Sequence, residues 1–125
     1  MSHQVIHTDN APAAIGPYSQ ATLGQAQVFT SGQLGLVPST GELPEDFEAQ
    51  ARQAFSNLAA IAQAAGTDLG HAMKITIFLT DMNNFPIVNR VMEEFCQAPF
   101  PARSCFAVAA LPKNAAVEVE AILSK

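Results

Sequence analysis

The tripeptide Arg103-Ser104-Cys105 places a cation and a thiol in a segment that we predict to be a β-strand. Alternate residues of a strand project to the same face, so Arg103 and Cys105 would lie together. A guanidinium on a rigid strand can donate two parallel hydrogen bonds to a carboxylate. A structural salt bridge to Asp or Glu is the simpler role, and the tripeptide alone favours it.

A pair of carboxylates stands in the alternating segment Val117-Glu118-Val119-Glu120. On a strand, this alternation puts both carboxylates on one face and both valines on the other. A solvated acidic face is the simplest interpretation of the pair. The functional interpretation is that one glutamate handles a water molecule, because a positioned acid–base group contributes typically ~10²–10⁴-fold to a rate. Burial would raise the pKa of that glutamate toward neutral pH.

Nucleophilic and metal chemistry have weaker support in the sequence. Cys105 could act as a nucleophile beside Arg103, but no histidine is placed near it by spacing, and a buried apolar role is favoured. His3, His7 and His71 have no cysteine or glutamate at a spacing that would complete a zinc site. We therefore expect no metal.

Two turn segments and one helical asparagine could add polar groups to a site. The turns are Gly16-Pro17-Tyr18-Ser19 and Thr30-Ser31-Gly32-Gln33, and both can be ordinary turns because Gly and Pro favour such backbone conformations. They can equally bring a phenol, a hydroxyl and free backbone amides to a ligand. Asn89 lies in a predicted helix and could be an ordinary surface residue.

Composition limits the classes of partner. The 125 residues fit one domain, 1–125, and carry a net charge of −5 with six scattered basic residues. Nucleic-acid binding requires a clustered basic surface, so we expect no nucleic-acid partner. Hydrophobic residues make up 49% and charged residues 14%, which indicates apolar surface covered by another subunit.

The chain also lacks targeting and membrane signals. Residues 1–7 show no charged start followed by an apolar run, so we predict no signal peptide. No apolar stretch reaches the roughly 18 residues that a membrane span requires. With only two cysteines, Cys96 and Cys105, the chain is interpreted as a reduced, cytoplasmic protein without a membrane partner.

Hydrophobic periodicity predicts an α+β domain, a mixed sheet with two helices on one face. An apolar stripe predicts a helix over 45–65, with Gly66 directly after it, and Pro86 marks the start of a second helix over 86–96. The predicted strands are 4–8, 19–23, 27–31, 72–80, 102–108 and 116–123. Gly24 lies between the second and third strands, which indicates a hairpin. One face of the strand 72–80 carries Met73, Ile75, Ile77 and Leu79. The segments 10–17, 35–44 and 110–114 are predicted loops.

These motifs also occur in a recognisable order. The ordered motifs are Asn10–Gln20, Thr30-Ser31-Gly32-Gln33, Gly41-Glu42, Gln50–Gln53, Asn57-Leu58, Lys74–Phe78, Asp81–Phe85, Asn89, Phe100–Cys105, Leu111–Lys113 and Val117–Ala121. Each motif is weak alone, but the ordered set resembles the reactive-intermediate deaminase (Rid, YjgF-like) family over about residues 6–122. The segment 96–99 and Ala110 depart from the family pattern, which bears on substrate size more than on the reaction.

The resemblance implies a fold similar to the trimeric chorismate mutases, with a trimeric barrel and three sites between subunits of a homotrimer. It implies hydrolysis of 2-iminobutanoate and 2-iminopropanoate, released by pyridoxal-phosphate enzymes, to 2-keto acids and ammonia without a cofactor or metal. By resemblance, Arg103 holds the substrate carboxylate, the Cys105 backbone contacts the imine nitrogen, and Glu118 positions the attacking water. The remaining implied pocket residues are Tyr18, Ser31, Gly32 and Asn89, with Tyr18 from the neighbouring subunit.

Other interpretations remain open at this point. The chain could be a non-catalytic metabolite-binding member, a chaperone-like member or an RNase of the same family. The net negative charge disfavours RNA as the main partner. A chorismate mutase would need more than one cationic group for its dianionic substrate, and only Arg103 is placed at the site.

Overall fold

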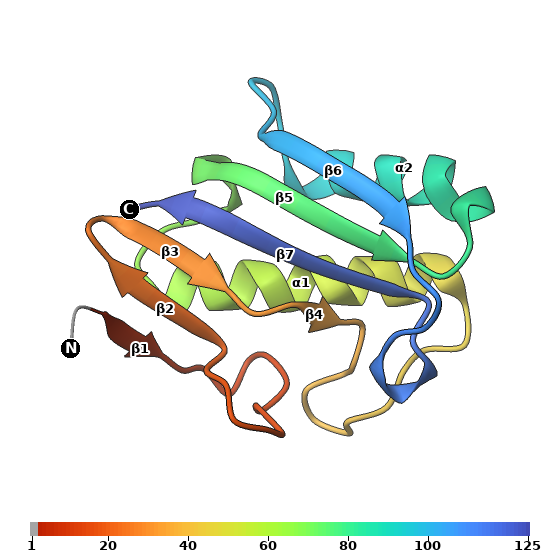
Figure 1. Ribbon diagram of the computed structural model, residues 1–125, viewed down its shortest axis with the longest axis horizontal. Helices are drawn as coiled ribbons and strands as arrows, with labels where there is room; N and C mark the ends of the chain where they lie inside the picture. The colour runs from red at the N-terminus through yellow and green to blue at the C-terminus, as the bar shows by residue number, and fades with distance from the viewer. Residues whose placement is uncertain (1–2) are drawn as a thin grey trace.

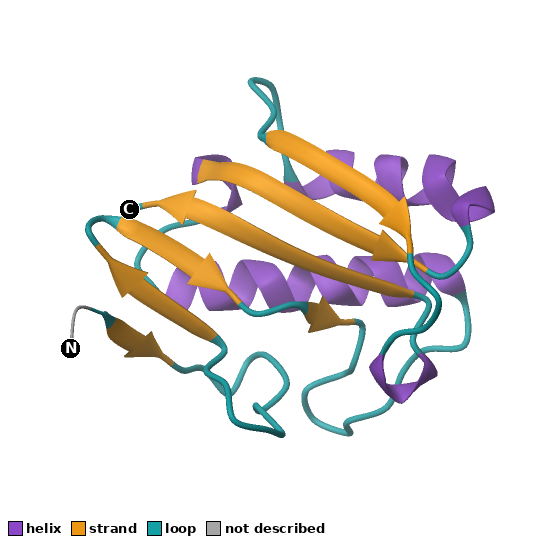
Figure 2. Cartoon of the chain, in the orientation of Figure 1, coloured by secondary structure: helices purple, strands orange, loops and turns teal. Residues whose placement is uncertain are grey.

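A single mixed β-sheet carries both helices on one face in the computed structural model, which describes residues 3–125 (Figures 1 and 2). Met1 and Ser2 lie outside the described residues. They begin the segment 1–7, in which we predict no signal peptide. The strands are β1 Gln4–Ile6, β2 Ala21–Gly24, β3 Gln27–Thr30, β4 Gln33–Leu34, β5 Ala72–Leu79, β6 Ala102–Ala107 and β7 Val117–Ser124. The helices are α1 Phe47–Ala64 and α2 Phe85–Phe95.

The strand order places β7 and β5 at the centre of the sheet. The order is β1-β2-β3-β7-β5-β6, and β4 pairs with β7 beside β3. Among the strands of residues 3–125, only β5 and β6 are parallel, because α2 connects them in a crossover; the other pairings are antiparallel. This arrangement confirms the predicted fold class. None of the helices in residues 3–125 is long and apolar enough to cross a membrane.

Capping residues determine where helix α1 begins and ends. Asp46 caps its start, and the Asp46 carboxylate accepts a hydrogen bond of 3.0 Å from the Ala49 backbone N–H. After its end, Gly66 adopts a φ of +84°, a left-handed conformation that favours glycine. The predicted helix over 45–65 is therefore confirmed, shortened by two residues at its start because Asp46 acts as the cap, and by one residue at its end, where Ala65 is the cap.

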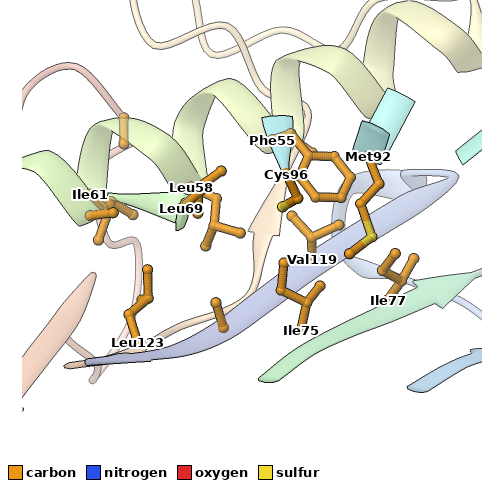
Figure 3. Close-up of a cluster of buried hydrophobic side chains, with 14 of the residues drawn as sticks. Phe55, Leu58, Ile61, Leu69, Ile75, Ile77, Met92, Cys96, Val119 and Leu123 are labelled. Carbon is orange, nitrogen blue, oxygen red and sulfur yellow. The ribbon is translucent and has the colours of Figure 1, made fainter. Parts of the chain in front are cut away.

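The core fills the space between the helices and the sheet (Figure 3). Phe55, Leu58 and Ile61 of α1 are fully buried against Ile75 and Ile77 of β5. Burial of side chains of this size contributes about 1.5–3 kcal/mol each, so this layer supplies the main driving force for folding. It holds α1, α2 and the two central strands together and provides a rigid base for the polar groups described below.

Four local features differ from the sequence-based predictions. Strand β4, inside the predicted turn region, was not predicted because two residues are too few to show a period. Gly24 is the last residue of β2, and the hairpin turn consists of Gln25 and Ala26, with φ of 52° and 63°. Met73, predicted to share a face with Ile75, Ile77 and Leu79, is 41% exposed because the β5–β7 pairing is irregular there. The predicted loop 110–114 contains a 3₁₀ turn, Pro112–Asn114.

The sheet face opposite the helices is left open in a single chain. Phe78 of β5 and Phe106 of β6 lie on it, with ring centroids 5.2 Å apart in an edge-to-face arrangement. Phe29 of β3 is 45% exposed and Phe106 is 46% exposed. Large exposed aromatic side chains on one sheet face are typical of a surface that another protein chain covers.

Candidate active site

Glu118 projects from β7 toward the open face of the sheet. The burial of β7 alternates, with Val117 and Val119 fully buried and Glu118 and Glu120 partly exposed. The predicted alternation of carboxylates and valines is thus confirmed. Burial raises the pKa of the Glu118 carboxyl above its ordinary value, and the negative charge of Glu120 raises it further.

Gly32 lies directly against the Glu118 carboxyl. A β-carbon at position 32 would overlap the Glu118 carboxyl group, so this close approach requires glycine. The turn before it is fixed by Ser31, whose backbone N–H donates to the Gln20 carbonyl over 2.8 Å and whose Oγ donates to the Ser19 carbonyl. The predicted turn residues Ser31 and Gly32 therefore meet Glu118 within one chain.

A hollow of about 370 Å³ opens beside this glutamate. Tyr18, Ser31, Gly32 and Glu118 line it together with apolar side chains. Its apolar lining residues are Pro12, Ala13, Ile15, Leu34, Leu36 and Pro112. Tyr18 thus accompanies Glu118 of its own chain. A carboxylate in a hollow with apolar walls can take up a proton from water near neutral pH.

Arg103 lies in a second hollow, lined also by Asn89, Met92, Glu93, Phe100 and Pro101. Its Nη1 donates a hydrogen bond to Asn89 Oδ1, and its Cζ lies 5.2 Å from the centroid of the Phe85 ring. The salt bridges found among residues 3–125 do not include Arg103. The simpler interpretation of Arg103, a structural salt bridge, is therefore wrong within this chain. An exposed guanidinium without a carboxylate partner is able to bind an anion.

Arg103 and Glu118 lie on opposite faces of the sheet. Arg103 pairs with Ile75 of β5, which is buried beneath the helices, and Glu118 pairs with Phe78 on the open face. Because Ile75 and Phe78 are an odd number of residues apart, their side chains point in opposite directions. One chain therefore divides the predicted residues into an Arg103–Asn89 group and a Glu118–Gly32–Ser31–Tyr18 group.

Cys105 shares a face with Arg103, as the alternation predicted, and lines neither hollow. Burial raises the pKa of its thiol, and the positive charge of Arg103 opposes this only in part. The thiol thus stays protonated near neutral pH, which disfavours a nucleophilic role. Among residues 3–125, no three His, Cys, Asp or Glu side chains form a group able to hold a metal ion.

Two buried side-chain amides, of Gln20 and Asn57, hold the walls of the Glu118 hollow. The sequence-based predictions did not name either as a functional residue. Gln20, 3% exposed, accepts from the Thr8 N–H and donates to the carbonyls of Thr8 and Pro12. Asn57, fully buried in α1, donates to the carbonyls of Leu34 and Leu36 over 3.0 and 2.8 Å. Asn57 could have been found from the sequence, because it is a polar residue within the apolar stripe of α1.

Comparisons with known proteins agree with the fold. The family model described as endoribonuclease L-PSP matches residues 8–124, so the chain belongs to this family, also called YjgF or Rid. It is 49% identical over 122 residues to the 2-iminobutanoate/2-iminopropanoate deaminase of Escherichia coli K12, covering 95% of each chain.

Further relatives extend this similarity. A RutC family protein of Pasteurella multocida is 49% identical over 126 residues and 98% of each chain. The crystal structure of E. coli TdcF with bound serine superposes with a TM-score of 0.94 at 46% identity, again over 98% of each chain. The family resemblance predicted from the sequence is confirmed.

Proposed function

We propose that this protein is a deaminase that hydrolyses 2-iminobutanoate and 2-iminopropanoate to 2-keto acids and ammonia. The observation that carries the proposal is Arg103, an oriented guanidinium without a carboxylate partner in residues 3–125. A 2-imino acid supplies such a carboxylate, one bond away from its C=N carbon. The deaminase relative at 49% identity and the serine-bound neighbour, which holds a small amino acid, support this substrate class.

The proposed site is completed by two subunits of a homotrimer. Arg103 and Glu118 occupy opposite faces of one sheet, so one substrate can touch both only if they come from different chains. Association through the open face would also cover Phe29, Phe78 and Phe106. In this arrangement, Glu118, Tyr18, Ser31 and Gly32 come from one subunit and Arg103, Asn89 and Cys105 from its neighbour.

The proposed reaction needs only water and the imino acid. Arg103 binds the carboxylate, and Glu118 accepts a proton from water as its oxygen forms a bond to the imine carbon. The substrate reacts as its N-protonated iminium, so the C=N electron pair moves to a nitrogen that already carries the extra proton and gives a neutral carbinolamine. Glu118 then gives the water proton to the amino group, the C–N bond breaks and ammonia leaves. The C=O bond of the keto acid forms as the hydroxyl proton passes to Glu118, which releases it to ammonia as ammonium.

The roles of the neighbouring groups follow from this scheme. The Cys105 backbone is proposed to contact the imine nitrogen, a role that does not need a thiolate. Tyr18 and Ser31 border the hollow in which the water would lie. We also propose a cytoplasmic location, because the thiols of Cys96 and Cys105 are free, as is usual in a reducing compartment.

A coupled assay tests the proposed reaction. A threonine dehydratase generates 2-iminobutanoate in the presence of semicarbazide, and 2-oxobutanoate formation is followed with and without the protein. We expect the protein to speed 2-oxobutanoate formation and Arg103→Ala to abolish the effect while the oligomer stays intact. A folded trimer that is inactive on imines from threonine, serine and bulkier amino acids would contradict the proposal.

A chaperone-like role is the second candidate, favoured by the exposed aromatic side chains of the open face. Binding of bis-ANS separates the two proposals. A trimer that covers this face should bind little dye, whereas a holdase that presents it should bind strongly. The RNase activity suggested by the family description has less support, because the chain carries a net charge of −5 and scattered basic residues.

A further inference from the structure

One face of α2 surrounds the Arg103 guanidinium. Phe85, Asn89 and Met92 lie at positions i, i+4 and i+7 of the helix, a spacing that places their side chains in one stripe. All three contact Arg103. The Phe85 ring centroid lies 5.2 Å from Cζ, Asn89 Oδ1 accepts a hydrogen bond from Nη1, and Met92 Sδ lies 3.9 Å from Nη1.

These contacts occupy one side of the guanidinium and leave the other free. Both polar contacts, to Asn89 and Met92, use Nη1. Within residues 3–125, Nε and Nη2 of Arg103 make no hydrogen bond to a side chain or backbone group. A carboxylate binds an arginine most strongly through two parallel hydrogen bonds. The Nε–Nη2 edge is therefore the edge available to a substrate carboxylate.

An exposed arginine needs help to keep one edge in place. Its long side chain has high rotamer entropy, and fixing it on binding weakens affinity. An aromatic ring beneath the guanidinium attracts the cation and restricts the plane of the fork. The Phe85 ring is itself held, because Phe85 is half-buried, packs against the core and begins α2 with its N–H bonded to the Met82 carbonyl.

We propose that Phe85 is a positioning residue that, together with Asn89, orients the Arg103 guanidinium so that its Nε–Nη2 edge receives the substrate carboxylate. This inference rests on the proposed imino-acid deaminase function. Phe85 acts through Arg103, so it should affect binding of the carboxylate more than the rate of the chemical step.

The test compares Phe85→Leu with Phe95→Leu. Phe95 is a matched control because it is a half-buried aromatic residue of the same helix, but it stacks on Phe55 with centroids 5.6 Å apart. Leucine keeps the apolar volume of each position closely enough for folding and removes the ring. The measurements are kcat and KM for the threonine-derived imine and the Kd of 2-oxobutanoate by calorimetry.

For Phe85→Leu, we expect KM and Kd to rise about three- to tenfold, with kcat within about twofold of the wild type. Phe95→Leu should leave Kd unchanged even where it lowers the melting temperature. Phe85→Tyr, which keeps a ring beneath the cation, should restore the wild-type Kd.

Three outcomes would contradict the inference: a wild-type Kd in Phe85→Leu, an equal loss of affinity in Phe95→Leu, or no recovery in Phe85→Tyr. A wild-type protein that neither consumes the imine nor binds 2-oxobutanoate would instead contradict the proposed function, and this inference would fail with it. The wild-type measurement therefore distinguishes the two failures.

Discussion

The Glu118 carboxyl lies against the α-carbon of Gly32, so one backbone position controls where the proposed base stands. Gly32→Ala would force the carboxyl away, and because the displaced group is the end of a side chain, the fold should survive. We expect kcat/KM to fall about 10²-fold, since the base loses its position, with an unchanged melting temperature. The coupled imine assay and thermal unfolding provide these two values.

Gly35→Ala serves as the contrasting variant for this prediction. A β-carbon at Gly35 would overlap the backbone of Gln50 in α1, which cannot move aside. This variant should lose stability as well as activity. Equal loss of stability in the Gly32 and Gly35 variants would argue that Gly32 serves the fold rather than the position of Glu118.

The activity should depend on pH through Glu118. Burial first, and the charge of Glu120 second, raise the pKa of Glu118, and its ionised form is the proposed base. Activity should therefore disappear as the pH falls through a value above the ordinary glutamate pKa. Glu120→Gln removes the like charge, so its kcat profile should keep the acid limb but move it to lower pH, whereas Glu118→Gln should be inactive.

The direction of the pH shift is the decisive result. An acid limb that moves to higher pH in Glu120→Gln would contradict the assigned cause. A greater loss of activity in Glu120→Gln than in Glu118→Gln would show that Glu120, not Glu118, is the base.

At the scale of residues, the sequence predicted which side chains share a strand face but not which other residues they contact. Alternation correctly placed Glu118 and Glu120 together on β7 and Arg103 beside Cys105 on β6. The contact of Gly32 with Glu118 joins residues far apart in the chain, and no local pattern reports it. The contacts of Arg103 come from α2 across a strand–helix packing, so no local pattern reports them either, and only the family resemblance placed Asn89 in the same pocket.

At the scale of elements, buried amides attach α1 to the segment that walls the Glu118 hollow. Asn57 donates to the carbonyls of Leu34 and Leu36, and Leu34 pairs with Glu118 in the short contact between β4 and β7. Because β4 has only two residues, its backbone pairing alone gives weak support. The Asn57 side chain thus helps to fix the position of the strand.

Asn57→Ala should destabilise the protein and loosen this wall. It removes the Asn57 amide donor from two buried carbonyls, and each hydrogen bond lost at a buried group costs about 1–3 kcal/mol. We expect a lower free energy of unfolding by chemical denaturation and faster hydrogen exchange at residues 33–36. Ser56→Ala, on the same helix at a half-buried position, is the control. A variant as stable as Ser56→Ala would contradict the role of Asn57.

The elements themselves were largely predictable. Long periodic segments such as α1 and β5 gave clear signals, because helix and strand periods differ. The prediction placed the β2–β3 turn at Gly24, because glycine is a common turn residue. The turn consists of Gln25 and Ala26, which adopt positive φ although glycine or asparagine is usual in such a turn. The neighbouring strands pair over four residue pairs and impose this conformation on the turn.

At the scale of the whole molecule, one chain presents two incomplete groups on opposite faces of one sheet. The composition indicated covered apolar surface, and the open face with Phe29 and Phe106 agrees with that expectation. Strand periodicity could not reveal the separation of Arg103 from Glu118. That separation follows from the pairing of both strands with β5, which only the three-dimensional structure provides.

Subunit complementation tests the central claim, a deaminase site shared between chains. Arg103→Ala and Glu118→Gln, each inactive alone, are co-expressed with different affinity tags, and the mixed trimers are isolated and assayed for imine hydrolysis. Each mixed trimer has one interface of its three that pairs an intact Arg103 with an intact Glu118, so a shared site predicts about one third of the wild-type activity. Mixed trimers that stay inactive, although wild-type trimers treated in the same way are active, would contradict a site shared between subunits.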